Sequence, residues 1–438
     1  MLSIFTLYTS VLCATARKRH TLLAAVLLLT SSLANASPTL LTFDEALRLA
    51  AVASASAKAS RASVAASSQA AARAAQLPDP MLKLGIDNLP VSGPDKFRPN
   101  ADFMTMRRIG IEQQWVSRDK RQARSERAQR ATESAEGAYL EKVATVREEA
   151  GKAWLTVLYR QRAVVLSRSV AREMEQDLAA LQAAHRGAKA SASDVLQAKT
   201  ELILSRDSIH AAEQELETAR INLRRWTRTD IVGVADTPPE LTTHVPTLPA
   251  SDLERYHPTV LNARRAVSLA DADKAVAVRE RNPDWSFEAG FAQRSSQYSN
   301  MVSFGVSIPL TLNRAQRQDR DIAEKSELGT KARLEYEEAL VDMQSTIQAQ
   351  SAQLESRKRR IAQLISELLP TVNQQGDLAL ADYRAGTGTL TAVFRAKRAL
   401  LEKRLQVNAL EEEAALIWAS LELHLIPHDI ATQSRAAQ

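Results

Sequence analysis

The stretch Gln76-Leu77-Pro78-Asp79-Pro80-Met81-Leu82-Lys83-Leu84-Gly85 decides the fold, because its pattern occurs twice in the chain. The second copy, about 205 residues later, reads Arg281-Asn282-Pro283-Asp284-Trp285 and reaches Gly290 in the position of Gly85. In each copy a proline, Pro78 or Pro283, ends a helical pattern, and an apolar alternation begins. Internal repeats determine architecture, so we predict one structural unit that the chain contains twice.

Each proline is followed by two short runs in which apolar and polar residues alternate. The first pair lies within 81–116 and includes Gly85 and Gly110, and the second lies within 285–311 and includes Gly290 and Gly305. A period of two over about ten residues is typical of a transmembrane β-strand, with apolar side chains toward lipid and polar ones toward water. The alternative is a soluble hairpin whose apolar face packs on a core.

Long helices are predicted to follow each hairpin. Residues 118–185 contain no proline, and their apolar spacing predicts a helix about 100 Å long. The chain then turns and returns over 193–227 with a heptad pattern, which is typical of a coiled coil. The helix before the hairpin (43–76) and the returning helix together match the long one in length. Each copy is therefore expected to form one antiparallel column. In the second copy, Pro370 should break or kink the long helix.

The predicted organisation has five parts. They are a signal peptide (1–36), a first repeat (37–229, tip near 187), a linker rich in proline and threonine (230–250), a second repeat (251–426, tip near 386) and a C-terminal tail (427–438). The signal peptide is inferred from basic residues at 17–19, an apolar run at 22–29 and the small-residue cleavage site Ala34-Asn35-Ala36. Cys13 precedes the basic residues and follows a leucine, so lipid attachment is not expected.

Composition excludes several classes of function. The net charge is +6, and removal of the signal peptide leaves about +3, so no nucleic-acid partner is expected. Cys13 is the single cysteine, and a mature chain without it has no disulfide and no thiolate metal site. No nucleophile elbow, phosphate loop or well-spaced set of metal ligands is present. We therefore expect neither an enzyme nor a bound cofactor.

The architecture follows from the strand count. Four membrane strands cannot close a barrel, and open strand edges in lipid are prohibitively costly, so several protomers must share one barrel. Three protomers give an even number of strands and cyclic symmetry. The expected fold is mainly α with a small transmembrane β part. It is a homotrimeric twelve-stranded β-barrel continued by a long α-helical barrel, and it is expected to conduct passively.

The doubled unit and the stretch Leu77 to Pro90 resemble the TolC family of outer-membrane efflux channels, and that stretch is similar to the branch that serves heavy-metal pumps of the resistance-nodulation-division type. The resemblance implies an outer-membrane channel with a long periplasmic extension. It also implies a periplasmic adaptor (membrane fusion protein) and a proton-driven inner-membrane efflux pump as partners. Within the family, a drug-efflux or type I protein-secretion channel is the alternative. Outside it, the alternative is a periplasmic coiled-coil adaptor or scaffold, although an adaptor should show one helical hairpin and glycine-rich β-domains.

The resemblance also points to residues of the periplasmic tip. Asp194 and Tyr383 match an aspartate and a tyrosine of the family pattern, which implies a gate formed by a hydrogen bond between neighbouring columns. Arg384 and Gly386 lie at the second turn. This chain has Gly388 where some members have an arginine, and Arg395 near where some have acids, so an acidic ring is not expected. The alternatives are that Asp194 caps a helix and that Tyr383 packs in the coil.

Two small groups of residues contain side chains of the types that bind metal ions. Met104 and Met106 share one face of a predicted strand and are soft ligands suited to copper(I) or silver(I). His424 and His428 are four residues apart, but Pro427 breaks the helix that would align them. We expect lipid- or lumen-facing methionines and no metal site, with metal specificity in the pump and adaptor.

Overall fold

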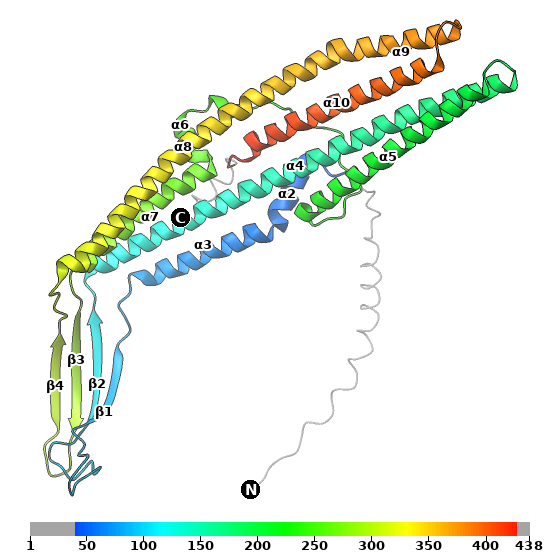
Figure 1. The fold of residues 1–438 in the computed structure, drawn as a ribbon. Coiled ribbons are helices and arrows are strands. Elements are labelled where there is room, and N and C mark those ends of the chain that lie inside the picture. The colour runs from blue at the N-terminus through cyan, green and yellow to red at the C-terminus, as the bar shows by residue number, and fades with distance from the viewer. Residues whose placement is uncertain (1–39, 427–438) are drawn as a thin grey trace, which may run out of the picture.

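The computed structural model describes residues 40–426. The predicted signal peptide with Cys13, and the tail with His428, lie outside the described residues. The described chain is long and narrow, with four strands at one end and two helical hairpin tips at the other (Figure 1).

The first half contains four helices and one hairpin. They are α2 (Phe43–Ala53), α3 (Ala55–Ala74), β1 (Met81–Asp87), β2 (Met106–Trp115), α4 (Arg118–Arg186) and α5 (Ala192–Thr227). The second half repeats this order with more interruptions. Its elements are η1 (Val245–Thr247), α6 (Ala250–Tyr256), α7 (Pro258–Glu280), β3 (Trp285–Gln293), β4 (Met301–Ser307), η2 (Arg314–Gln316), α8 (Gln318–Gln363), the π-helical turn η3 (Leu364–Leu368), α9 (Leu369–Arg384) and α10 (Leu390–Leu423).

One antiparallel sheet contains both hairpins in the order β1-β2-β3-β4. The β2–β3 pairing joins the two halves, with Gly110 opposite Gly290. Two strand boundaries differ from the sequence prediction. β4 ends at Ser307, short of the predicted limit at residue 311, because Pro309 has no amide hydrogen for a ladder. Met104 lies in the turn before β2, where its backbone N–H donates to Asp102 Oδ1 (2.6 Å), so it does not share a strand face with Met106.

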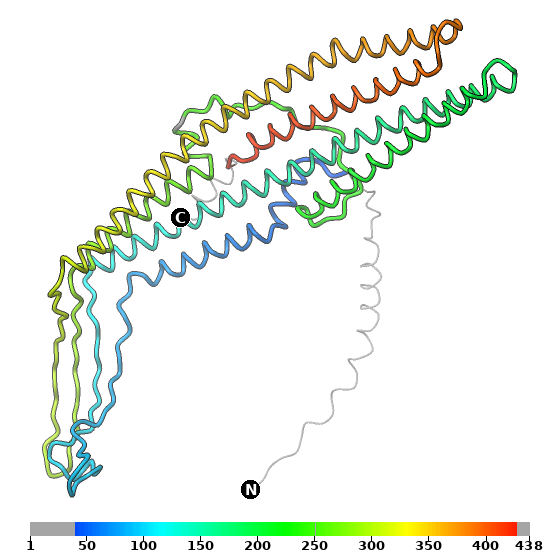
Figure 2. The backbone as a smooth tube through the Cα atoms, in the orientation of Figure 1, coloured from blue at the N-terminus to red at the C-terminus, as the bar shows by residue number. Residues whose placement is uncertain are grey.

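Each half forms the expected antiparallel column. The helix α4 extends along α2, α3 and α5, whose combined length nearly matches its own. In the second half, α8 with α9 extends along α7 and α10 (Figure 1). The heptad pattern of α5 is the packed face: Leu202, Leu216 and Leu223 are buried there, and Ala198 and Ala219 allow close helix approach. Figure 2 shows that both hairpin tips lie at the end of the molecule opposite the strands.

The predicted single helix over 43–76 is wrong, because the chain breaks at Ser54. The backbone of Ser54 is extended (φ −62°, ψ 114°), and its side chain accepts from the backbone N–H of Ala57 (3.2 Å), which caps α3. A serine that caps a new helix competes with continuation of the old one. The break lets α2 turn its buried residues Ala46, Leu47 and Ala50 into the central core.

Pro370 distorts the second long helix as predicted. It occupies the first turn of α9, and the π-helical turn at 364–368 lies just before it. Proline has no amide hydrogen and its ring crowds the preceding carbonyl. The π-helical turn is wider than an α-helical turn, so it accommodates the missing amide hydrogen and the bulk of the ring. The helix then continues to the tip.

The main core lies midway along the molecule, where α2, α4, α5, α10 and the linker meet. Trp154 is fully buried there, its Nε1–H donates to the Leu41 carbonyl (2.9 Å), and its ring lies 5.3 Å from that of Phe43. Leu41 forms a parallel bridge with Val234 of the linker. The Gln161 amide donates to the Val234 carbonyl (3.1 Å) and accepts from its N–H (2.8 Å). The linker is thereby attached to the columns.

Candidate functional sites: the sheet and the helical tip

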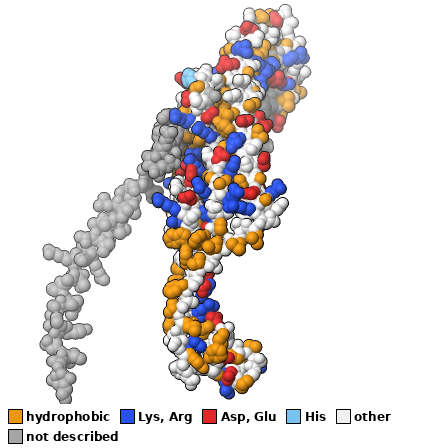
Figure 3. Space-filling model, turned by 90° about the vertical axis from the view of Figure 1, so that its left-hand side faces the viewer, with side chains coloured by type: hydrophobic (Ala, Val, Ile, Leu, Met, Phe, Trp, Pro, Cys, Tyr) orange, Lys and Arg blue, Asp and Glu red, His pale blue; other side chains and the backbone are white. Residues whose placement is uncertain are grey.

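The sheet has one apolar face, and this face is exposed. Paired residues of an antiparallel sheet lie on the same face, so the register assigns Leu82, Leu84 and Ile86 of β1 to the face of Ile109 and Ile111. The same face continues through Phe287, Ala289 and Phe291 to Val306, Phe304 and Val302. Phe304 is 85% exposed and Leu84 is 70% exposed. Figure 3 shows hydrophobic side chains along this part of the molecule. Within the described chain, nothing packs on this face as a core would.

The opposite face is polar and carries linked charges. Lys83 Nζ lies 2.5 Å from Glu112 Oε2 and 2.8 Å from Glu288 Oε2, so one ammonium group bridges strands of both halves. Arg108 Nε lies 3.1 Å from Asp87 Oδ2. The alternation predicted from the sequence therefore separates an apolar face from a charged one.

Aromatic residues lie at both ends of the strands. Trp115 and Trp285 are directly opposite each other where the sheet meets the helices, and they are 53% and 47% exposed. At the far end, the rings of Phe103 and Tyr298 are 6.5 Å apart in the two hairpin loops. Exposed aromatic rings at two levels are typical of the two interfaces of a membrane. These aromatic levels were not predicted, although tryptophans at matching ends of the strands are a visible signal in the sequence.

The structure places the predicted markers of strand and turn at the ends of the strands and within them. Pro78 and Pro283 lie between helix and strand. Gly110 and Gly290 meet at the seam between the halves: a Cβ on Gly110 would lie 3.1 Å from the Ala289 carbonyl oxygen. At Gly85 and Gly305, on the β1 and β4 edges, a Cβ would meet nothing nearer than 3.8 Å in this chain.

At the opposite end, the two hairpin tips pack on each other. A small apolar cluster joins them, made of Leu181, Ala198, Leu390 and Phe394, and Tyr383 packs against it. The Gln197 amide donates to Thr391 Oγ1 (2.8 Å). Lys397 pairs with Asp177. The tips are therefore held together by apolar, hydrogen-bonded and ionic contacts.

Asp194 caps its own helix. Its Oδ2 accepts from the Ser191 hydroxyl (2.7 Å) and from the Ser191 backbone N–H (3.2 Å), while Ser191 Oγ accepts from the Asp194 N–H (3.1 Å). This reciprocal arrangement is a capping box, which satisfies backbone donors at the start of α5. Asp194 therefore contributes to capping, but the N-cap residue is Ser191, and Asp194 is the third residue of the helix.

Tyr383 and Asp194 nevertheless line one groove between the tips, together with Arg384, Gly386 and Gly388. Burial raises the pKa of the Tyr383 phenol, and the Asp194 charge raises that pKa further. The groove therefore keeps the phenol protonated and able to donate. Arg395 is exposed on α10 and is not among the groove residues.

The second tip needs its glycines. Gly386 has φ +77°, which a side chain would strain. At Gly388 a Cβ would lie 2.9 Å from Asp382 Cβ and 3.0 Å from the Tyr383 backbone nitrogen. An arginine at this position would therefore displace the turn.

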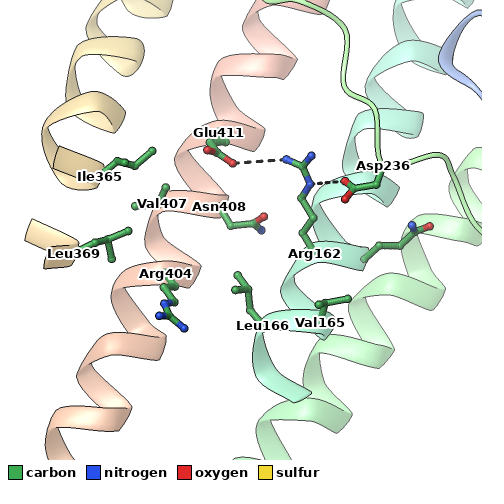
Figure 4. A pocket seen from close by; sticks show the side chains of 11 residues that line it. Arg162, Val165, Leu166, Asp236, Ile365, Leu369, Arg404, Val407, Asn408 and Glu411 are labelled. Atoms are coloured by element: carbon green, nitrogen blue, oxygen red, sulfur yellow. Dashed lines mark hydrogen bonds and ion pairs between the residues drawn. The ribbon is translucent and has the colours of Figure 1, made fainter. Parts of the chain in front are cut away.

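A hollow of about 530 Å³ lies between the columns, beside the π-helical turn. Arg162 reaches across it: Nε lies 2.7 Å from Asp236 Oδ1 of the linker and Nη1 lies 3.8 Å from Glu411 Oε2 (Figure 4). Burial raises the pKa of Glu411, and the charge of Arg162 opposes this shift. The other walls are mostly apolar and include Ile365 and Leu369. Arg162, which belongs to α4, therefore connects the linker with α10.

His424 lies beside a second half-buried histidine, His257. His424 Nδ1 lies 2.8 Å from Glu148 Oε2, and its ring is 5.0 Å from that of His257. Burial lowers the pKa of His257 to about 4, helped by His424. Although burial raises the pKa of Glu148, hydrogen bonds from His424 and Lys152 outweigh it and bring that pKa to about 2. Between residues 40 and 426, no group of three or more suitable side chains could hold a metal ion.

Among the described residues 40–426, every helix is either too short or too polar to cross a membrane.

The fold matches solved structures of membrane channels. CusC, described as forming a transmembrane channel, is 15% identical, with a TM-score of 0.74 over 87% of this chain and 91% of its own. The outer-membrane protein VceC of Vibrio cholerae is 15% identical, with a TM-score of 0.71 over 88% of this chain and 95% of its own. The MtrE outer-membrane channel of Neisseria gonorrhoeae is 16% identical, with a TM-score of 0.70 over 87% of this chain and 88% of its own. The chain has the fold of these outer-membrane channels. The structural match covers both columns and the sheet. No family model and no curated protein matches the sequence.

Proposed function

We propose that this protein is the outer-membrane exit duct of a tripartite efflux system, and that it works as a homotrimer by passive conduction. The observation that carries the proposal is the sheet, with an exposed apolar face on one side and a charged face on the other. A soluble protein rarely exposes a contiguous apolar surface of this kind, whereas lipid would cover it.

The outer strands favour a shared barrel. β1 and β4 are the two edges of the sheet, and every residue of β4 is exposed. An unpaired edge leaves backbone donors and acceptors without partners, and lipid cannot satisfy them. Three copies of four strands close a twelve-stranded barrel. Its charged face then lines a water-filled lumen, and the helices continue the tube on the periplasmic side.

The partners and cargo follow from the family resemblance of residues 77–90. An adaptor and a proton-driven inner-membrane pump supply the energy and the substrate. Heavy-metal cations are the proposed cargo. Drugs or secreted polypeptides are the alternatives within the same fold. The duct itself has no catalytic role and no cofactor.

The groove between the tips is the proposed gate. In the closed channel, the Tyr383 hydroxyl donates to the Asp194 carboxylate of a neighbouring column. The double change Asp194→Ala with Tyr383→Phe should raise the single-channel conductance in a planar bilayer. Unchanged conductance would remove this pair from the gate.

Membrane fractionation and conductance test the duct itself. The full chain should remain in the outer-membrane fraction after carbonate washing and should form ion-conducting trimers in planar bilayers. Complete release by carbonate would favour a soluble adaptor or scaffold. Deletion of the gene, followed by growth tests ion by ion and drug by drug, identifies the cargo: sensitivity to metals alone supports the heavy-metal proposal.

A further inference from the structure

The hollow beside the π-helical turn has the size of a ligand site. Its volume of about 530 Å³ falls within the range of about 300–1,000 Å³ that is typical of small-molecule sites. Its helical walls come from α4 of the first half, from α10 of the second half, and from the place where η3 continues into α9 (Figure 4). Every wall belongs to the same chain, so a site here requires no second copy.

The middle of the hollow is apolar on all three helical walls. Val165 and Leu166 come from α4, Ile365 and Leu369 come from η3 and α9, and Val407 comes from α10. Val165 and Ile365 are exposed to water in the described chain. A ligand that covered them would remove apolar surface from water, which is favourable. The middle of the hollow therefore favours a ligand with an apolar body.

The charged groups lie at the two ends of the hollow. On α10, Arg404 and Glu411 are seven residues apart, which is about 10 Å along the axis at about 1.5 Å per residue. At the Glu411 end, Arg162 is shared between two carboxylates, those of Glu411 and Asp236. At the other end, the Arg404 guanidinium has no ion pair or hydrogen bond within the described chain. One end therefore has an excess of acid, and the other has an unpaired cation.

We propose that this hollow binds a small amphipathic monoanion, whose carboxylate or sulfonate group pairs with Arg404 and whose apolar body lies between α4, α9 and α10. A guanidinium donates two parallel hydrogen bonds to such a group. A second negative charge at the far end would meet Asp236 and Glu411, which outnumber Arg162, so a dianion is disfavoured. The charges thus determine both the class of ligand and its orientation.

The π-helical turn supports a binding role for this place. Such turns are rare and occur frequently at functional sites. Here the turn covers Leu364–Leu368, and it places Ile365 and Leu369 on the wall of the hollow. A bound ligand would contact both halves of the chain, because α4 belongs to the first half and α9 and α10 belong to the second. Binding should therefore raise the melting temperature of the protein.

Equilibrium dialysis with naphthalene-2-sulfonate, an amphipathic monoanion, tests the site. The full-length protein is purified in detergent, the same detergent is present on both sides of the membrane, and micelles without protein give the background. The natural protein should bind one probe per chain. Arg404→Gln removes the charge and should raise the Kd at least tenfold. Arg404→Lys keeps the charge and should bind more tightly than Arg404→Gln, which separates loss of charge from loss of folding.

Arg172→Gln is the matched control for the charge. Arg172 is exposed on α4 outside the hollow, and within the described chain its guanidinium donates only to the Arg168 carbonyl (3.4 Å). Its loss should leave the Kd for the sulfonate unchanged. Equal Kd values for the natural protein and Arg404→Gln would overturn the proposal.

Two analogues test the class of ligand. Naphthalene-2-sulfonamide has the same shape without the charge, so it should bind at least tenfold more weakly than the sulfonate and should not respond to Arg404→Gln. Naphthalene-2,6-disulfonate carries a second charge at the opposite end, where it would meet Asp236 and Glu411, so it should also bind more weakly. Tighter binding of the disulfonate than of the monosulfonate would overturn the proposed orientation.

A filling variant tests the position of the probe. Ile365→Trp keeps Arg404 but places a bulky side chain in the hollow, so binding of the sulfonate should be lost while thermal unfolding stays cooperative. Unchanged binding to Ile365→Trp would place the probe elsewhere and would overturn the site. Binding that appears only after deletion of residues 427–438 would show that the tail fills the hollow, and this result would also overturn the proposal.

The natural ligand can be a resident amphiphile, such as a fatty acid, or a solute that binds transiently. Organic extraction of the purified protein, followed by mass spectrometry, distinguishes them. A monoanion that is extracted from the natural protein and absent from Arg404→Gln identifies a resident ligand. A protein that is empty on extraction and binds the sulfonate reversibly identifies a transient one. Both results support the site.

The site and the proposed duct are tested independently, because dialysis requires neither conduction nor a trimer. A protein that binds the sulfonate but does not conduct overturns the duct and leaves the site standing. A protein that conducts but does not bind the sulfonate overturns the site alone.

Discussion

Gly110 and Gly290 lie opposite each other where β2 of the first half pairs with β3 of the second. A Cβ on Gly110 would lie 3.1 Å from the Ala289 carbonyl oxygen, and a Cβ on Gly290 would lie 2.9 Å from Ser303 Oγ. Gly110 therefore lies close to the backbone of the second half, whereas the nearest atom at Gly290 is a serine hydroxyl of its own half that can rotate.

Gly110→Val should destabilise this seam. A β-branched side chain pressed against backbone forces the strands apart, at a cost of about 1–3 kcal/mol for overpacking. Thermal unfolding of the purified protein measures the effect. Gly376→Ala in α9 is the control, because its Cβ would meet nothing nearer than 4.0 Å and alanine favours the helix. Equal melting temperatures for Gly110→Val and the natural protein would show that the seam has room for a side chain at this position.

Lys83→Met should leave Glu112 and Glu288 without their shared cation. Two carboxylates then face the same site, and their only remaining counter-charge among the described residues is Arg108, 4.0 Å from Glu288. Folding of the sheet should therefore suffer, and the yield of heat-resistant protein should fall. The triple variant Lys83→Met, Glu112→Gln, Glu288→Gln removes the charges together and should recover much of the loss. If Lys83→Met folds as well as the natural protein, the bridge between β1 and β3 contributes nothing to the sheet.

Ser191→Ala and Asp194→Ala should weaken the start of α5 to a similar extent. Each removes half of the capping box, which costs about 1 kcal/mol, and hydrogen exchange at the tip would detect it. The pair also separates capping from gating. If the Asp194 carboxylate closes the channel, only Asp194→Ala raises the conductance. If the cap alone matters, both variants raise it equally.

Stability should fall in acid because of His257 and Glu148. Burial holds the pKa of His257 at about 4, below its usual value of 6.5, so the unfolded chain takes up this proton first as pH falls. Stability is therefore complete above about pH 6.5 and is lost progressively toward pH 4. The pKa of Glu148, near 2 instead of 4.5, extends the loss to lower pH.

His257→Gln isolates the histidine contribution. It removes the proton uptake between pH 6.5 and 4, so its melting temperature should vary less with pH across that window than that of the natural protein. His210→Gln is the control, since His210 is 78% exposed. Parallel pH curves for the natural protein and His257→Gln would contradict the assignment.

Much of the fold could be predicted from local patterns. The prolines, the period-two runs and the seven-residue repeat each report on neighbouring residues, so strands and helices were located within a few positions. The break at Ser54 was missed, because its cause is a side chain that caps the next helix while α2 turns into a core formed by distant segments.

Sequence alone determined the duplicated unit, its long helices and the two faces of its strands, because backbone sterics and the period of apolar residues are local properties. Only the tertiary structure decided which strands meet at the Gly110–Gly290 seam, that Lys83 bridges two glutamates, that Trp115 faces Trp285, and that His424 pairs with Glu148. These contacts join residues far apart in the chain. Their distances depend on how whole helices and hairpins pack, and no local period records that packing.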